Sequence, residues 1–211
     1  DKAFTALAGP ANINIVANER YARADTSVEA QVLKILAAKP DAVLIGGSGT
    51  PGALPAISLA GRGYKGAVYG NHGMVNPDFL RVGGKGVEGL IAPTGPLVVV
   101  ELLPDSSPVK SIASSFVKAY DAAYGVQNRN AFAGYAYDAN VLLEKAVPEA
   151  MKTAKPGTPA FRAALRNALE NLREVAGTHG VYTMSPGNHN GMDARARVMV
   201  KVESGAWKML Q

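Results

Sequence analysis

Two glycine-rich loops carry most of the side chains in this sequence that could bind or transform a small molecule. Residues 46–50 read GGSGT and offer the hydroxyl groups of Ser48 and Thr50, while residues 71–73 read NHG and offer the imidazole of His72. Hydroxyl groups, an imidazole and the backbone N–H groups of a glycine loop can all donate hydrogen bonds to a carboxylate or carbonyl oxygen. This combination of residue types indicates a binding site for a small polar ligand.

Each loop directly follows a short apolar run that we predict to be a buried β-strand, over residues 41–46 and 67–69. A helix is predicted before the first run, over residues 28–38, and a second one between the two runs, over residues 55–60. This alternation is typical of a parallel sheet, in which ligands collect at the carboxyl ends of the strands. Both loops are therefore predicted to lie at the same edge of one sheet.

The first loop also matches parts of two enzyme motifs, so a nucleotide-dependent or hydrolytic α/β enzyme is the alternative function. Gly47, Gly49 and Gly52 fit the G-x-G-x-x-G pattern of dinucleotide-binding loops, but the next strand ends without the Asp or Glu that this fingerprint requires. Gly46 and Ser48 begin a G-x-S-x-G nucleophile elbow, whose last glycine position is held by a threonine. A tight turn with no chemical role is the third interpretation of these glycines.

Catalytic partners for Ser48 are suggested only by chain order, and they would be Asp138, His179 and His189. A metal ion near residues 188–193 is disfavoured, because one histidine and one aspartate in a glycine turn supply too few ligands. We therefore expect no catalytic residue, no metal ion and no cofactor.

The composition of the chain excludes several other classes of function. The 211 residues carry a formal net charge of +5, but the 22 lysines and arginines are scattered rather than clustered, which argues against nucleic-acid binding. The absence of cysteine excludes disulfides and thiolate chemistry. Apolar runs fall well short of the roughly 20 residues that a membrane-spanning helix needs.

The remaining patterns suggest two parts of the chain joined by crossing segments. Prolines punctuate an apolar connection, 97–103, that we predict to be extended, and a strongly helical region follows it. Strand patterns return after Gly177, so we place the crossings near residues 93–108 and 177–182. The other predicted elements are helices over 2–8, 111–124, 131–151 and 158–172 and strands over 13–16, 87–92, 180–183, 196–202 and 207–210.

Five segments, taken in order, carry a resemblance to a known family. AVLIGGSGTPGALP, AVYGNHGMVNPDFL, GGKGVEGL, FAGYAYDANVLLEKA and GVYTMSPGNHNGMD resemble the type I periplasmic solute-binding proteins of ABC importers, in the branched-chain amino acid receptor family. The resemblance implies an α/β fold of two Rossmann-like lobes with parallel sheets, joined by crossing strands. It assigns residues 1–92 and 177–211 to the second, C-terminal lobe and residues 93–176 to the crossover and helices of the first, N-terminal lobe. The opening segment of the family pattern is missing, so this first lobe is expected to be incomplete.

The same resemblance implies a receptor with no enzymatic activity, which captures a small carboxylate-bearing solute in the periplasm and delivers it to an ABC permease in the inner membrane. His72 stands where similar amino-acid-binding members carry a carboxylate that pairs with the ammonium group of the ligand. An aromatic or 2-oxo acid is therefore favoured, with branched-chain or other amino acids as the alternative. A separate chain carrying the rest of the first lobe is a further expected partner. By residue matching, the ligand-binding residues are Ser48, Gly49, Thr50, Asn71, His72, Gly73 and Tyr137.

Overall fold

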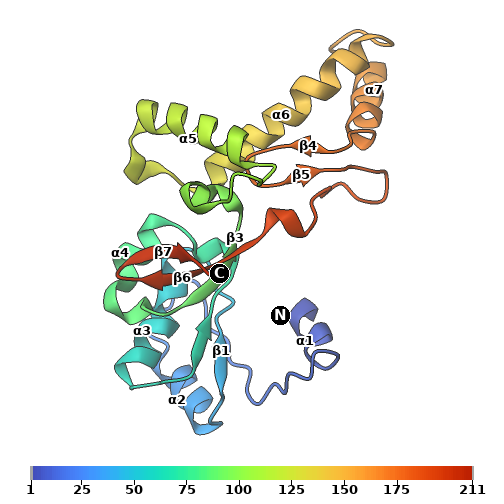
Figure 1. Cartoon of the computed structure of the whole chain (residues 1–211). Helices are drawn as coiled ribbons and strands as arrows, with labels where there is room; N and C mark the ends of the chain where they lie inside the picture. The colour runs from blue at the N-terminus through green and yellow to red at the C-terminus, as the bar shows by residue number, and fades with distance from the viewer. Residues whose placement is uncertain (1, 211) are drawn as a thin grey trace. The chain divides into compact units, whose positions relative to one another are not determined.

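A computed structural model describes residues 2–210 and divides the chain into two compact units (Figure 1). The first unit comprises Asp1–Pro93 and Met199–Gln211, and the second comprises Thr94–Val198. The chain leaves the first unit after Pro93. The return crossing follows residue 198 rather than residue 177, so residues 177–198 belong to the second unit.

The first unit is built on a five-stranded mixed sheet. Its strands are β1 (Ala42–Leu44), β2 (Ala67–Tyr69), β3 (Ile91–Thr94), β6 (Val198–Glu203) and β7 (Ala206–Met209), in the spatial order β1-β2-β3-β6-β7. β1 pairs in parallel with β2, and β2 with β3, while β6 and β7 form an antiparallel hairpin. The predicted parallel arrangement of the strands that precede the two glycine loops is thus confirmed.

Helices α1 (Lys2–Ala8), α2 (Glu29–Ala37), α3 (Ala53–Gly61) and α4 (Pro77–Gly83) complete the first unit, with short 3-10 turns at Thr50–Gly52, His72–Met74 and Gly84–Val87. Figure 1 shows α2, α3 and α4 on one side of the sheet and α1 on the other. The covered side holds a core of Val28, Val32 and Leu59, against which Val43 and Val68 of the strands pack. Neighbouring strand residues point to opposite faces, so Leu44 and Tyr69 lie on the other face and are 45% and 38% exposed.

Two strand predictions in the first unit were wrong in part or in whole. Residues 13–16 form no strand. In the described structure this segment makes no ladder of hydrogen bonds with a neighbouring strand, and a strand needs such a partner. The strand predicted over 87–92 begins only at Ile91, because Val87 ends a 3-10 turn over residues 84–87.

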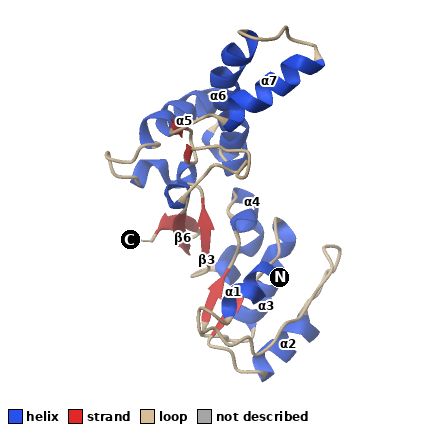
Figure 2. Cartoon of the chain, turned by 90° about the vertical axis from the view of Figure 1, so that its right-hand side faces the viewer, coloured by secondary structure: helices blue, strands red, loops and turns tan. Residues whose placement is uncertain are grey.

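The second unit is mainly helical. It contains a kinked 3-10 segment at Pro96–Leu102, helices α5 (Lys110–Tyr124), α6 (Ala131–Met151) and α7 (Pro159–Glu170), 3-10 turns at Val126–Asn128 and Ala194–Ala196, and strands β4 (Val175–Ala176) and β5 (Val181–Tyr182). The prediction that residues 97–103 are extended was wrong, whereas α6 has the bounds predicted for it. β4 and β5 pair only with each other and are antiparallel, so the described part of this unit has no parallel sheet. Figure 2 shows the helical character of this unit.

Within residues 2–210, the structure contains no helix both long enough and apolar enough to cross a membrane.

Candidate ligand-binding site

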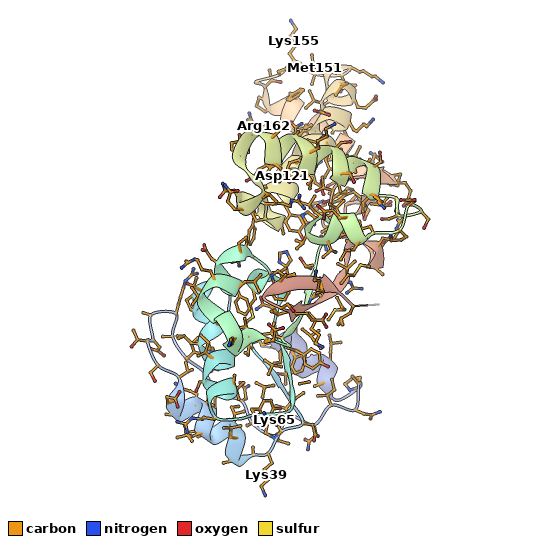
Figure 3. All side chains as sticks on the ribbon, turned by 60° about the vertical axis from the view of Figure 1, so that its left-hand side comes forward. Lys39, Lys65, Asp121, Met151, Lys155 and Arg162 are labelled. Atoms are coloured by element: carbon orange, nitrogen blue, oxygen red, sulfur yellow. The ribbon has the colours of Figure 1, made fainter. Side chains whose placement is uncertain are left out.

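The two glycine loops leave the carboxyl ends of neighbouring parallel strands. Beyond the strand ends, Ile45 N donates a 2.8 Å hydrogen bond to Tyr69 O, and Gly70 N donates one of 2.7 Å to Ile91 O. These bonds extend the ladder to the point where each loop begins. Lys39 and Lys65, at one end of the first unit in Figure 3, precede β1 and β2 and mark the opposite edge of the sheet.

The loops, residues 46–52 and 70–74, are joined by hydrogen bonds, and we call them the paired loops. The side-chain amide of Asn71 donates from Nδ2 to Gly47 O at 2.6 Å, and its Oδ1 accepts from Gly73 N at 2.8 Å. Gly49 N donates to Gly73 O at 3.1 Å, which adds a direct backbone link. The two loops predicted to lie at one edge therefore form a single hydrogen-bonded element.

Glycine is required in the paired loops for two different reasons. Gly49 has φ 63° and ψ −157°, a backbone conformation that residues with a side chain adopt only under strain. Gly47 and Gly73 are sites of close approach. A Cβ atom on Gly47 would lie 2.2 Å from the hydroxyl oxygen of Tyr21, and one on Gly73 would lie 3.0 Å from Cβ of Ser48.

The polar side chains of the paired loops differ in their exposure. Ser48 and Thr50 are exposed, while His72 is half-buried. Burial lowers the pKa of His72 from its ordinary value of 6.5, so the imidazole is neutral at pH 7. A neutral imidazole carries one N–H donor and one acceptor nitrogen, and it can donate to a carboxylate or a carbonyl oxygen.

The hydrogen bonds of the first loop argue against the dinucleotide-binding interpretation. Gly49 N is committed to Gly73 O, and Gly52 N donates to Gly49 O at 3.1 Å. A pyrophosphate cradle depends on free backbone N–H groups that point at the ligand. Two of the three glycines in the G-x-G-x-x-G match therefore have their donors already occupied.

Asp138 and His179, suggested by chain order as catalytic partners of Ser48, are engaged within the second unit. His179 is fully buried, and its Nε2 lies 2.8 Å from Ala131 O, an acceptor that requires the proton to reside on Nε2. Asp138 is 1% exposed and accepts hydrogen bonds from Thr178 N, His179 N and the Tyr182 hydroxyl. These polar groups serve the packing of α6 against residues 177–182.

The turn at residues 188–193 is held by side-chain hydrogen bonds. Asn188 Oδ1 accepts from Asn190 N and Gly191 N, at 3.1 and 3.0 Å. His189 Nε2 lies 3.0 Å from a carboxylate oxygen of Glu170. Among residues 2–210, no group of three or more His, Cys, Asp or Glu side chains is arranged to hold a metal ion.

Tyr137 lies on α6 in the second unit and is 36% exposed. Its ring packs against that of Phe116 on α5, with a centroid distance of 4.9 Å. This contact gives Tyr137 a role in packing, and its contact with a ligand stays a prediction.

Tyr21 is a residue of the loop region that the sequence patterns did not single out. Its hydroxyl donates to Pro51 O at 3.3 Å, and its ring end lies against Gly47. Burial raises the pKa of Tyr21, which keeps the hydroxyl protonated. No local motif marks this tyrosine, because it precedes the first loop by a whole helix and strand.

Comparison with known proteins identifies the family to which this fold belongs. The sequence profile of the family described as periplasmic binding protein matches residues 1–206. This chain belongs to the periplasmic binding protein family. Its similarity to solved receptors and amino-acid ABC binding proteins places it among the type I members. Among curated protein sequences, none matches the chain significantly.

Several solved structures resemble this periplasmic binding protein along its whole length. A protein from Rhodopseudomonas palustris is 43% identical, with a TM-score of 0.95. The match covers 100% of this chain and 59% of the length of that protein. An extracellular ligand-binding receptor from Rhodopseudomonas palustris HaA2 is 41% identical with the same TM-score and the same two shares. A putative branched-chain amino acid ABC transporter from Rhodospirillum rubrum is 25% identical, with a TM-score of 0.72. The match covers 99% of this chain and 56% of the length of that protein. The chain thus spans less than two thirds of the length of these structures.

Proposed function

We propose that this chain is part of the substrate-binding component of an ABC transporter, which captures a small carboxylate-bearing solute between two lobes and delivers it to a permease in the inner membrane. The observation that carries the proposal is the joining of the paired loops at the carboxyl edge of parallel strands, where ligands collect in α/β folds. In this proposal Ser48, Thr50 and His72 donate hydrogen bonds to the solute. The solute is released without any chemical change. The site of action is the periplasm.

The solute we propose is an aromatic or 2-oxo acid. A ligand with an ammonium group needs an anionic or accepting partner, and a carboxylate is the usual one. His72 supplies instead a half-buried imidazole that burial keeps neutral. The acceptor nitrogen of a neutral imidazole can take a hydrogen bond from an ammonium group, but it supplies no negative charge, so this pairing is weaker than the one with a carboxylate. Branched-chain and other amino acids are the alternative, and the relative from Rhodospirillum rubrum is described as a putative branched-chain amino acid ABC transporter.

The two units correspond, in this proposal, to the two lobes of the receptor. The first unit is the C-terminal lobe, which carries the paired loops, and the second unit belongs to the N-terminal lobe, which carries Tyr137. The matched structures are longer than this chain. The remaining part of the N-terminal lobe, on the same or on a separate chain, would complete the site.

Ligand-dependent thermal stability tests the proposed function. A solute that binds only the folded state raises the melting temperature, by an amount that grows with its concentration relative to Kd. We expect phenylpyruvate and benzoate to raise it more than L-leucine does, and calorimetry to rank the affinities in the same order. Tighter binding of L-leucine contradicts the proposed solute class. Stabilisation by ATP or NAD, or release of product from a carboxylic ester, favours the enzyme alternative.

A further inference from the structure

We infer that Asn71 is a positioning residue, which couples Ser48 to His72 by holding the two loops in one register and does not itself contact the solute. The inference rests on the proposed function of the paired loops as the solute site. It differs from the expectation from sequence, in which Asn71 was one of the ligand-binding residues.

Both ends of the Asn71 amide are used inside the protein. Nδ2 donates to Gly47 O at 2.6 Å, and Oδ1 accepts from Gly73 N at 2.8 Å. A carbonyl only accepts and a backbone N–H only donates, so these partners fix the orientation of the amide. The position therefore requires a side chain that carries one donor and one acceptor on the same planar group. Aspartate has a similar shape but lacks the donor, so it cannot bond to Gly47 O.

Gly73 transmits the position of Asn71 to the first loop. Its N–H is held by Asn71, and its carbonyl oxygen accepts from Gly49 N at 3.1 Å. Gly49 follows Ser48 directly, and Ser48 itself lies close to Gly73. Loss of the Asn71 amide should therefore release a hydrogen bond that Asn71 does not make, the one between Gly49 and Gly73.

This coupling matters for binding because the solute would meet a preformed pair of donors. A loop that is already ordered loses little conformational entropy when a ligand binds, and preorganisation of this kind raises affinity. Tyr21 supports the first loop as well, through a hydrogen bond from its hydroxyl to Pro51 O. Of Tyr21 and Asn71, only Asn71 joins the first loop to the loop that carries His72.

Amide hydrogen exchange of the ligand-free chain, measured by NMR for Asn71→Ala and Asn71→Asp, tests the coupling. The matched control is Asn130, whose Oδ1 accepts from Ala133 N at 3.1 Å and whose Nδ2 donates to Asn128 O at 2.8 Å. Asn130 thus makes one bond as donor and one as acceptor in the other unit, both to residues within three positions of it. We expect exchange at Gly49 N–H to accelerate about tenfold in both Asn71 variants and to stay unchanged in Asn130→Ala and Asn130→Asp. An unchanged rate at Gly49, or equal acceleration in the controls, overturns the inference.

Calorimetry with phenylpyruvate and benzoate then separates positioning from a purely structural role. We expect Asn71→Ala to bind the better of these acids about tenfold more weakly than wild type, while Asn130→Ala retains wild-type affinity. Faster exchange at Gly49 with unchanged affinity shows that Asn71 has only a structural role and overturns the inference. Wild-type chain that binds neither acid contradicts the proposed solute class, whereas the exchange rates still decide whether Asn71 couples the loops.

Discussion

The hydroxyl of Tyr182 donates a 2.8 Å hydrogen bond to Oδ2 of Asp138 and so joins β5 to the middle of α6. The same carboxylate accepts from Thr178 N at 2.5 Å and from His179 N at 3.0 Å. Burial and the nearby Asp138 carboxylate raise the pKa of Tyr182, which keeps its hydroxyl protonated as a donor. Residues 178–182 are therefore tied to the second unit, so the chain does not return to the first unit at residue 177.

Replacing Asp138 should destabilise the second unit. Asp138→Asn keeps the shape of the side chain, but it loses an acceptor and turns an N–H group toward existing donors. Hydrogen bonds to a buried charged group are among the stronger ones, so we expect the free energy of unfolding to fall by about 2 to 4 kcal/mol. Urea denaturation followed by circular dichroism measures this change.

Glu144→Gln is the control for that measurement, because Glu144 is an exposed carboxylate on the same helix and accepts one hydrogen bond, from Asn140 Nδ2. A change within about 0.5 kcal/mol is expected there. Equal stability losses for Asp138→Asn and Glu144→Gln would show that the buried network contributes nothing beyond a surface contact.

A methyl group at Gly49 should disturb the first loop through its backbone. The φ of 63° with ψ of −157° lies in a region essentially restricted to glycine, and the strain of an alanine there is about 1 to 3 kcal/mol. Gly46 is the matched control, because a Cβ atom on it meets nothing within 4 Å and its φ is outside the left-handed region. Thermal unfolding should show a loss for Gly49→Ala and a change within about 0.5 kcal/mol for Gly46→Ala. Comparable losses for both variants would contradict the backbone argument.

The elements that sequence predicted well are those whose signals lie within their own residues. α6 has a long apolar periodicity, and α7 starts where Thr158 caps it by accepting from Phe161 N. The strands before the two loops were predicted from continuous apolar runs bounded by turns, but the prediction that these strands are buried was wrong, because only the middle residue of each is even partly buried. Residues 97–103 show the limit of this reasoning, since a short apolar run reads equally as a strand or as a buried helical turn.

What the sequence did not predict depends on contacts between distant residues. Residues 13–16 have strand-like composition, but the ladder partner that a strand requires cannot be read from that composition. The place of residues 178–182 in the second unit depends on Asp138, which contacts residues about forty positions away in the chain. At the candidate site, sequence identified both loops, but the Asn71 amide that joins them and the supporting Tyr21 emerge only from the structure.

The half-buried His72 should make stability depend on pH. Burial lowers its pKa below 6.5 in the folded chain, and unfolding restores the ordinary value, so just below pH 6.5 the unfolded state binds more protons. The contribution of His72 to the free energy of unfolding should therefore fall as the pH drops below 6.5. Above that range the contribution should stay constant. Urea denaturation of wild type and His72→Gln at about pH 7.5 and about pH 5.5 isolates the contribution. A difference between the two proteins that is the same at both pH values would contradict the burial of the ring.

Substitutions at His72 test its proposed role as a donor to the solute. His72→Ala leaves an oxygen of the solute unpaired in a desolvated site, so binding of phenylpyruvate or benzoate should weaken by about 1 to 3 kcal/mol. His72→Glu should weaken binding of these acids further, because a carboxylate would face another anion, and should shift preference toward L-leucine, whose ammonium group it can pair with. Calorimetry on wild type and both variants provides the affinities, with Glu144→Gln, outside the paired loops, as a control. Wild-type affinity in His72→Ala, or loss of L-leucine binding relative to the acids in His72→Glu, would contradict a donor role for this imidazole.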